Sequence, residues 1–426
     1  MRYIEMSRAE LLKEQEALLS KYGQYKEMDL QLNMTRGIPS KEQLELSMPM
    51  LDTINSTSNL VTKDGTDLRN YGGVDGISEA KKFFADILDV STEEIIVGGN
   101  SSLTMMFDTI SSAMGHGLLG GTPWANQGKV KFLCPCPGYD RHFSITNYFG
   151  IEMIPIEYID GQPDMDTIEK LVNSDEKVKG IWCVPKYSNP TGITYSDETV
   201  RRFARLRPAA EDFRIFWDNA YFVHNLFGED TKLLNLLEEC KKEGNPNMVY
   251  MYFSTSKITF PGAGLAGMAT SVTNAEAIKK RIAVQSIGPD KINQYRHIAF
   301  INNSGGIYAQ MERHSEILRP RFTAVAKALD ENLTQSGVAS WSNPNGGYFV
   351  NFNAMIGCAK KIVSMCKEAG VVLTNAGASF PYGNDPEDKN IRIAPTSPSV
   401  EELIKAIEIL AVCTKLTAIE QLLKNS

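Results

Sequence analysis

The chain has 426 residues, of which 42% are hydrophobic and 22% are charged, a composition typical of a globular protein in water. This length exceeds one ordinary domain, but no low-complexity linker or change of charge divides the chain, so we expect two closely packed lobes. The net charge of −7 gives phosphate backbones and anionic lipids no general attraction, which argues against nucleic acid and membrane as partners.

The first residues predict a helix rather than a targeting segment. Ser7 and Glu10 form a capping-box pattern at its start, and Gly23 is the expected end. No apolar run here resembles a signal segment, and no window of the sequence has the length and apolarity of a membrane span. The expected compartment is the cytoplasm.

From about residue 78 onward, short apolar runs rich in Val and Ile alternate with amphipathic stretches. This alternation predicts an α/β fold in which helices cover a mostly parallel, seven-stranded sheet. The candidate strands are residues 94–99, 129–135, 151–158, 178–185, 213–218, 248–255 and 264–271. Ligands of such sheets bind beyond the carboxyl ends of the strands, so the loops that follow these runs should carry the chemistry.

After about residue 310 the pattern changes to a long helix, a WSNPNGGYFVNFN segment, a helix near 355–369 and a final long helix. This order predicts a smaller α+β lobe, which the N-terminal helix completes by folding back. We expect residues 56–314 to form the large domain, and residues 1–55 together with 315–426 to form the small domain.

Seven cysteines are scattered along the chain, an odd number that does not suggest a disulfide framework. Cys134 and Cys136 form a CPC pair at the end of a predicted strand. No second Cys or His pair lies at the spacing of a zinc site, so we interpret both as packing residues and expect no metal.

Lys257 ends an STSK motif that begins at Ser254, after a predicted strand and before the Gly- and Pro-rich ITFPGAG loop. An amine at the end of an apolar strand, among hydroxyl groups, is a plausible nucleophile with a lowered pKa beside a bound phosphate. Taken alone, a lysine at a strand end is more often a solvated surface charge.

Two further motifs follow predicted strands. The YSNPTG motif contains Asn189, and by itself it predicts only a proline-containing turn. The WDNAY motif directs the Asp218 carboxylate and the Tyr221 phenol toward the same edge of the sheet, although Asp218 could equally cap a helix.

The GGNSS motif opens a helix after another predicted strand and contains Ser101 and Ser102. Unpaired backbone N–H groups, two hydroxyl groups and the positive end of the helix dipole together form an anion site. An ordinary capped helix start explains the same residues equally well.

Together, in this order and at these spacings, the four motifs resemble the fold-type I aminotransferases, which use pyridoxal phosphate. The resemblance spans nearly the whole chain, through TRGIP at 35–39, RNYGGVDG at 69–76, PGYDRHF at 137–143 and RIAP at 392–395. The residues of these stretches are similar to those of a divergent bacterial, aspartate-aminotransferase-like branch of class I.

The resemblance implies roles for the residues around the cofactor ring. Lys257 would hold pyridoxal phosphate in a Schiff base and move a proton to and from the substrate α-carbon. Asp218 would keep the pyridine nitrogen protonated, so that the ring accepts electrons. Asn189 and Tyr221 would hydrogen-bond the phenolic oxygen, and Tyr139 would stack on the ring.

The resemblance also implies how the phosphate is held. Ser101, Ser102 and Ser254 would bind it, with the start of a helix behind them. Tyr71 matches a tyrosine that the neighbouring subunit donates to the phosphate, which implies a homodimer with shared active sites.

The substrate, by the same resemblance, would bind through its α-carboxylate. Arg392 matches the arginine that binds this group, a role suited to its planar fork of donors. Gly37 would let the backbone approach the same carboxylate, and Asn189 would also contact the substrate.

The sequence departs from the family at two positions. Most relatives have a phosphate-binding arginine eight residues after the lysine, where this chain has Leu265; Arg36, Arg69 and Lys291 are possible substitutes. One branch binds the distal carboxylate of aspartate with a lysine where this chain has Asn100. Arg36, Arg141 and Lys291 are the candidates left for that task, and each could instead be a surface charge.

The leading hypothesis is a pyridoxal-phosphate aminotransferase that moves the amino group of a small dicarboxylic amino acid, aspartate, to 2-oxoglutarate by a ping-pong mechanism. The alternatives with the same cofactor are aromatic or kynurenine transamination and carbon–sulfur β-elimination. A non-catalytic regulator that binds an effector is disfavoured, because the resemblance begins by residue 35 and leaves no room for a DNA-binding domain.

Overall fold

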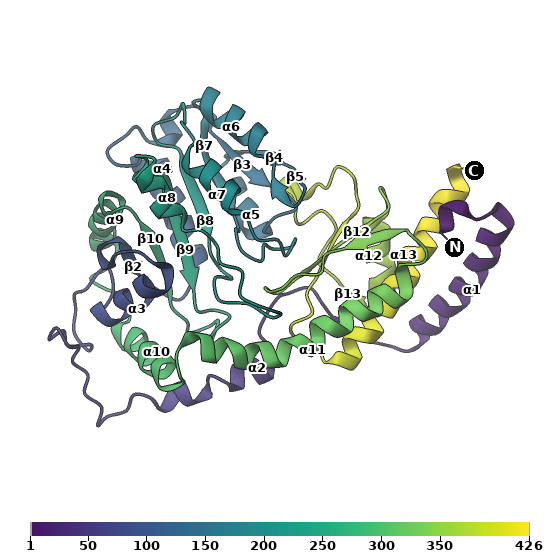
Figure 1. Ribbon diagram of the computed structural model, residues 1–426, viewed down its shortest axis with the longest axis horizontal. Coiled ribbons are helices and arrows are strands. Elements are labelled where there is room, and N and C mark those ends of the chain that lie inside the picture. Colours follow the sequence, from purple (N-terminus) through teal and green to yellow (C-terminus); the bar gives the residue numbers. More distant parts are fainter. Residues whose placement is uncertain (1, 426) are drawn as a thin grey trace.

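A seven-stranded sheet forms the centre of the larger lobe in the computed structural model, which describes residues 2–425 (Figure 1). Its strands lie in the order β2-β10-β9-β8-β7-β3-β4, with β10 antiparallel to both neighbours and all other pairs parallel. The strands are β2 (Ile95–Val97), β3 (Lys131–Pro135), β4 (Glu152–Ile156), β7 (Val178–Cys183), β8 (Arg214–Asp218), β9 (Val249–Ser254) and β10 (Ala266–Thr270). The α/β class and all seven predicted strands are confirmed.

Both faces of this sheet are buried, which explains why its strands are almost continuously apolar. In β8, Phe216 packs into the core on one face, whereas Ile215 and Trp217 pack into the core on the other. The first face is covered by α4 (Ser102–His116), α5 (Asp140–Tyr148) and α9 (Val272–Gln285). The second is covered by α3 (Ser78–Leu88), α6 (Met165–Ser174), α7 (Asp197–Ala204), α8 (Leu236–Lys242) and α10 (Lys291–Asn303).

Helix α11 (Ile307–Leu333) runs from the larger lobe into a smaller one (Figure 1). There an antiparallel sheet in the order β11-β12-β14 shares a core with α11 and the last two helices. These elements are β11 (Ala339–Trp341), β12 (Val350–Ala354), β14 (Asn390–Ile393), α12 (Ala359–Glu368) and α13 (Val400–Asn425). The smaller lobe therefore has the predicted mixture of helices and strands.

The N-terminal segment completes the smaller lobe, as the sequence predicts. Helix α1 (Arg8–Glu27) lies beside α13, and β1 (Leu32–Asn33) pairs in parallel with β13 (Val371–Val372) (Figure 1). The remaining elements are α2 (Lys41–Glu45), the hairpin of β5 (Tyr158–Ile159) and β6 (Gln162–Pro163), and short 3₁₀ helices at Tyr3–Glu5, Met48–Asp52, Thr92–Glu94, Trp124–Asn126, Pro246–Met248 and Pro381–Gly383.

Helix α1 has the predicted start but not the predicted end. The Glu10 carboxylate accepts a hydrogen bond of 2.7 Å from the Ser7 backbone N–H, and the Ser7 hydroxyl accepts one from Glu10. The helix passes through Gly23 and ends at Glu27, so the predicted end is wrong. The last turn of α1 buries Tyr25 against α13. The free energy gained by this burial offsets the roughly 1 kcal/mol that a glycine costs inside a helix.

The predicted division after residue 314 lies within α11, which is continuous there, and the domain boundaries stay a prediction. Within residues 2–425, none of the helices has the length and apolarity needed to cross a membrane.

Candidate active site

A cavity of about 550 Å³ lies between the two lobes, at the carboxyl ends of the parallel strands. The larger lobe contributes the ends of β7 and β8, the start of α5 and the loop after β9, and the smaller lobe contributes the segments next to β1, β12, β13 and β14. The residues that line it are Thr35, Arg36, Gly37, Ile38, Tyr139, Asp140, Arg141, Val184, Asn189, Asp218, Ala220, Tyr221, Lys257, Phe349, Val372, Leu373, Thr374, Asn375 and Arg392.

Asp218 is the last residue of β8, and its carboxylate is buried. Its Oδ2 atom accepts a hydrogen bond of 2.9 Å from Nε2 of His142, whereas its Oδ1 atom has no hydrogen-bond partner among the described residues. A buried carboxylate oxygen without a partner is costly, so this atom is suited to a protonated nitrogen of a ligand. No helix begins at Asp218, so the alternative role as a helix cap is wrong.

Lys257 follows β9 and extends toward the aromatic residues beside Asp218. Its Nζ lies 4.9 Å from the centre of the Tyr221 ring and 5.7 Å from that of Tyr348. Burial lowers the pKa of Lys257, and the negative charge of Asp218 partly opposes this change. Within the described part of the chain its Nζ atom forms no ion pair or hydrogen bond, so the deprotonated amine is available as a nucleophile and proton carrier.

Two tyrosines line the same cavity as Lys257. Burial raises the pKa of Tyr139 to about 12, and burial also raises the pKa of Tyr221 well above its usual value. Both phenols therefore keep their protons at neutral pH and can donate hydrogen bonds.

Arg392 lies on β14 and is only 8% exposed. Its Nη1 donates to Oδ1 of Asp140 at 2.9 Å and to Oδ1 of Asn189 at 3.3 Å, and its Nη2 donates to the Thr374 hydroxyl at 3.3 Å. Its guanidinium also lies 4.9 Å from the centre of the Phe349 ring. These contacts hold the guanidinium of Arg392 at the wall of the cavity.

Gly37 lies next to the tip of the Phe349 ring. A Cβ atom at this position would lie 2.4 Å from Cζ of Phe349, far inside contact distance. The position therefore needs glycine as long as the ring stays beneath the guanidinium of Arg392.

The predicted phosphate residues lie at the same edge of the sheet but do not line this cavity. Ser101 caps α4 by accepting a hydrogen bond from the backbone N–H of Thr104, Ser102 is the first residue of α4, and Ser254 is the last residue of β9. The GGNSS motif thus forms the predicted helix start. Tyr71 is 79% exposed and does not reach the cavity of its own chain.

Leu265 is buried in the core and places no charge near these serines. Arg69 forms an exposed ion pair with Asp67, whereas Lys291 is only 4% exposed and donates a hydrogen bond of 2.9 Å to the Gly72 carbonyl. Because Lys291 has no carboxylate partner among the described residues, it is a buried cation that can accept an anion.

Arg36 and Arg141 both line the cavity and are exposed. Neither side chain forms an ion pair or hydrogen bond with any residue of the described chain. The structure therefore brings two of the three candidates for the distal carboxylate to the cavity, and Lys291 is not one of them.

The motifs do not reveal several residues that shape the site. His142 lies one helical turn after Tyr139 on α5, stacks on Trp182 with ring centres 4.3 Å apart, and holds the Asp218 carboxylate. Phe349 supports Arg392 from beneath. The i, i+3 spacing of Tyr139 and His142 in PGYDRHF indicates only that the two side chains lie on the same side of a helix, and not that His142 contacts Asp218.

A second, larger cavity of about 980 Å³ lies between α4 and α9 and contains none of the predicted site residues. All seven cysteines are free and buried, so Cys134 and Cys136 are packing residues as interpreted. No cluster of metal-ligating side chains occurs within residues 2–425.

The residues around the cavity fit pyridoxal phosphate. Asp218 offers a carboxylate oxygen without a partner, Lys257 an amine of lowered pKa, and Tyr139 and Tyr221 aromatic rings with protonated phenols. This donor set matches a cofactor that has a basic ring nitrogen, a carbonyl carbon and a flat ring.

Comparisons with known proteins agree with the geometry of this site. The family model described as aspartate amino-transferase matches residues 6–426. A predicted aminotransferase of Mycolicibacterium smegmatis is 46% identical over 425 residues, which cover 99% of each chain, and an aspartate aminotransferase of Corynebacterium glutamicum is 42% identical over 95% of this chain and 94% of its own.

The fold is also shared with a solved structure. The crystal structure of an aspartate transaminase from Corynebacterium glutamicum superimposes with a TM-score of 0.96 at 40% sequence identity, covering 99% of both chains. The chain therefore belongs to the aspartate aminotransferase family and is an aminotransferase.

Proposed function

We propose that this enzyme transfers the amino group of aspartate to 2-oxoglutarate by a ping-pong mechanism. The observation that carries the proposal is the excess of positive charge in the cavity, which is lined by Arg36, Arg141, Arg392 and Lys257 but by only two carboxylates. Asp140 faces Arg392, and Asp218 faces His142, so Arg36 and Arg141 are left without anionic partners among residues 2–425.

A dicarboxylic substrate is complementary to this distribution of charge. Its α-carboxylate would bind Arg392, whose planar fork suits a carboxylate, and its distal carboxylate would bind Arg36 or Arg141. Both substrates of the proposed reaction carry two carboxylates, and the substrate of the Corynebacterium relatives, as their names state, is also aspartate.

The same proposal gives the cofactor-binding roles to the residues around Asp218. Pyridoxal phosphate, when bound, supplies a sink for the electron pair that remains when the substrate α-carbon loses its proton. Asp218 Oδ1 would hold the proton on the ring nitrogen, and His142 would keep the carboxylate in place. Asn189 and Tyr221 would bind the ring oxygen, and Tyr139 would cover the ring face.

Lys257 would hold the cofactor covalently until the substrate amine displaces it. Its freed amine would then take the proton from the α-carbon of the amino donor. In the second half of the ping-pong reaction it would return a proton to the α-carbon of the new amino acid. The lowered pKa of Lys257 supports this role, because a catalytic base must be deprotonated near neutral pH.

Ser101, Ser102, Ser254 and the N-terminus of α4 would hold the phosphate. The buried Lys291 is the strongest substitute for the missing arginine, since its ammonium is unpaired among the described side chains and adjoins the loop that contains Tyr71.

The proposal includes a homodimer with shared active sites. The exposed side chains of Tyr71, Val284 and Ile287 support it, with 79%, 91% and 60% of their surfaces accessible. The Gly72 N–H donates to the Ile287 carbonyl at 3.2 Å, which holds the loop of Tyr71 beside the segment that follows α9, and exposed apolar side chains are suited to a partner subunit. The buried free cysteines support a reducing compartment, the cytoplasm.

Steady-state assays of alternative amino donors test the proposal. With 2-oxoglutarate as acceptor, kcat/KM for aspartate should exceed that for phenylalanine, kynurenine and cystathionine. Arg36→Ala or Arg141→Ala should raise KM for aspartate roughly tenfold, with little change for alanine, because only aspartate has the second carboxylate.

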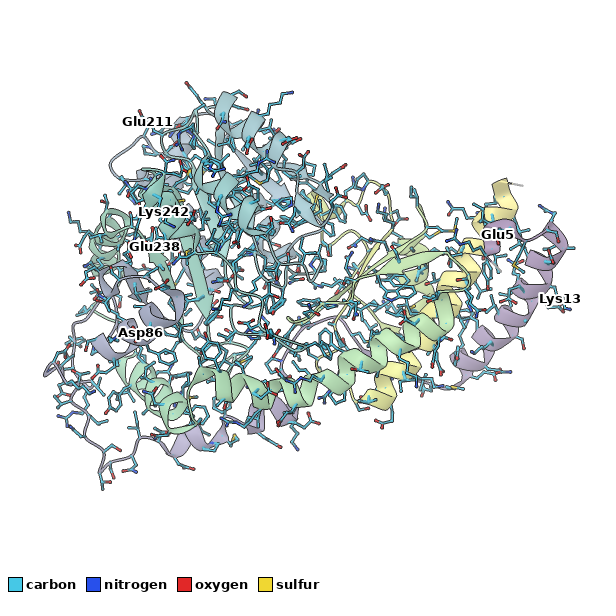
Figure 2. All side chains as sticks on the ribbon, in the orientation of Figure 1. Glu5, Lys13, Asp86, Glu211, Glu238 and Lys242 are labelled. Atoms are coloured by element: carbon cyan, nitrogen blue, oxygen red, sulfur yellow. The ribbon has the colours of Figure 1, made fainter. Side chains whose placement is uncertain are left out.

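The matched control is Lys13→Ala, which removes a positive charge from the exposed face of α1, away from the cavity (Figure 2). This variant should keep the KM of the wild type. No turnover of aspartate would refute the substrate, and faster turnover of phenylalanine or cystathionine would favour the corresponding alternative.

A further inference from the structure

The ion pair between Asp140 and Arg392 occupies the place where the proposed substrate carboxylate would bind. Asp140 Oδ1 lies 2.9 Å from Arg392 Nη1, and both residues line the cavity. The Arg392 side chain is 8% exposed and that of Asp140 is 30% exposed, so water screens this pair only in part.

Asp140 does not use the full binding capacity of Arg392. The contact is a single hydrogen bond through Nη1, and Nε of Arg392 is buried without a partner among the described atoms. A carboxylate from a ligand can instead form two parallel hydrogen bonds with a guanidinium, which are stronger and fix its orientation. A ligand can therefore replace Asp140, although it must compete with it.

We propose that Asp140 is an internal competitor of the substrate, bound to Arg392 before the substrate arrives and displaced when the substrate α-carboxylate binds. This inference rests on the proposed function, because it takes Arg392 as the carboxylate anchor. When the Asp140–Arg392 ion pair is formed, Arg392 is not free to bind substrate, so the fraction of binding-competent molecules falls. The ion pair therefore weakens the apparent affinity for substrate without contacting the reacting atoms.

Arg392 keeps its position when Asp140 is displaced, because other groups hold it. The Thr374 hydroxyl and the Asn189 amide oxygen each accept a hydrogen bond from it at 3.3 Å, and the Phe349 ring lies beneath it. Removal of the Asp140 charge should thus leave the guanidinium of Arg392 ordered and available to bind a ligand.

The pair also explains how a nearly buried arginine is tolerated before a substrate binds. A buried charge without a partner is strongly destabilising, and Asp140 supplies the missing anion until a substrate arrives. As the first residue of α5, Asp140 is favoured by the helix dipole as well, but the dipole accounts for an acid at this position and not for its bond to Arg392.

Equilibrium binding of succinate and pyruvate to the holoenzyme tests this role, with titration calorimetry as the readout. Asp140→Asn should tighten the binding of both ligands by roughly three- to tenfold, the range expected for loss of one partly buried competitor. The same substitution should lower KM for aspartate, with the effect falling on KM rather than on kcat. Asp140→Glu, which keeps the charge, should retain the weak binding of the wild type.

The control is Asp86→Asn, which makes the same change of net charge on the exposed side of α3, away from Arg392 (Figure 2). It should leave both affinities unchanged. Unchanged or weaker binding in Asp140→Asn would overturn the inference. A wild-type enzyme that does not prefer succinate to pyruvate would instead refute the dicarboxylate substrate, while the ratio between the variants would still decide the role of Asp140.

Discussion

Gly37 shows how a residue without a side chain shapes the substrate site. A Cβ atom at this position would meet the tip of the Phe349 ring, and the guanidinium of Arg392 lies 4.9 Å from the centre of the same ring. The GIP sequence indicates only a backbone approach, whereas the structure identifies the ring that requires it.

The substitution Gly37→Ala should therefore weaken substrate binding through Phe349. A Cβ atom would lie 2.4 Å from the ring, which must move and give up its contact with Arg392. Loss of a cation–π contact of about 1 kcal/mol, together with some disorder of the fork, should raise KM for aspartate roughly tenfold.

Steady-state kinetics would measure this change against Gly23→Ala, where a new Cβ meets no atom within 4 Å. The control should keep its KM and gain up to about 1 kcal/mol of stability, since alanine is the better helix former. An unchanged KM in a folded Gly37→Ala enzyme would show that Phe349 does not position Arg392.

The sequence identifies some site residues and not others, for a physical reason. Asp218 and Lys257 were predictable because Asp218 ends one recognisable strand and Lys257 follows another, and parallel strands bring their carboxyl ends to one edge. The contacts of His142 and Asp140 were not, because they depend on how α5 is rotated against β8 and on how the smaller lobe brings β14 to α5.

At the scale of the elements, a buried polar network connects α2 and α11 to the loop that contains Lys257. Gln43 Nε2 donates to the Tyr348 hydroxyl oxygen at 3.0 Å and lies 3.0 Å from His314 Nδ1. His314 Nε2 lies 3.0 Å from the Ile258 carbonyl, which can only accept, so Nε2 carries the proton and Nδ1 accepts from Gln43. The neutral imidazole thus joins α2 and α11 to the residue after Lys257.

This network should make the stability of the protein depend on pH. Burial lowers the pKa of His314 to about 4, from an ordinary value of about 6.5. Between these two values the unfolded chain binds more protons than the folded chain, so the stabilisation is complete above pH 6.5 and is lost as the pH falls toward 4. His297, whose pKa burial also lowers to about 4, adds a similar effect.

His314→Gln should reduce the pH dependence, because it removes one of these protonation sites. Between pH 7 and pH 5 the variant should lose about 2 kcal/mol less stability than the wild type, although it is less stable than the wild type at pH 7. Urea denaturation at the two pH values measures this difference. His116→Gln, at an exposed position on α4, is the control, and an equal loss in His314→Gln and wild type would contradict the assignment.

The elements were predictable where burial is regular. Strands β3, β7, β8 and β9 are buried on both faces, and this produces the apolar runs that locate them. The antiparallel direction of β10 was not predictable, because strand direction depends on the path of the chain between strands. The end of α1 was missed because packing of Tyr25 on α13 overrides the local preference of Gly23.

At the scale of the whole molecule, both lobes line the cavity, and neither lobe alone supplies all of the candidate site residues. Asp218 and Lys257 come from the larger lobe, whereas Arg392 and Phe349 come from the smaller lobe, which also contains both ends of the chain (Figure 1). Tyr71 lies in the long segment between α2 and α3 and does not reach its own cavity. In the proposed homodimer its phenol would instead act at the site of the partner subunit.

Complementation between two variants of low activity would test this arrangement. Tyr71→Ala should impair a site in the partner subunit, and Lys257→Ala should inactivate the site of its own subunit. In a mixed dimer, one site combines the intact Lys257 of the first variant with the intact Tyr71 of the second. Unfolding and refolding the variants together at equal concentration should yield half mixed dimers with one working site each, and therefore about a quarter of wild-type activity. Each variant refolded alone is the control, and activity of the mixture no higher than the mean of the two controls would show that Tyr71 does not act across subunits.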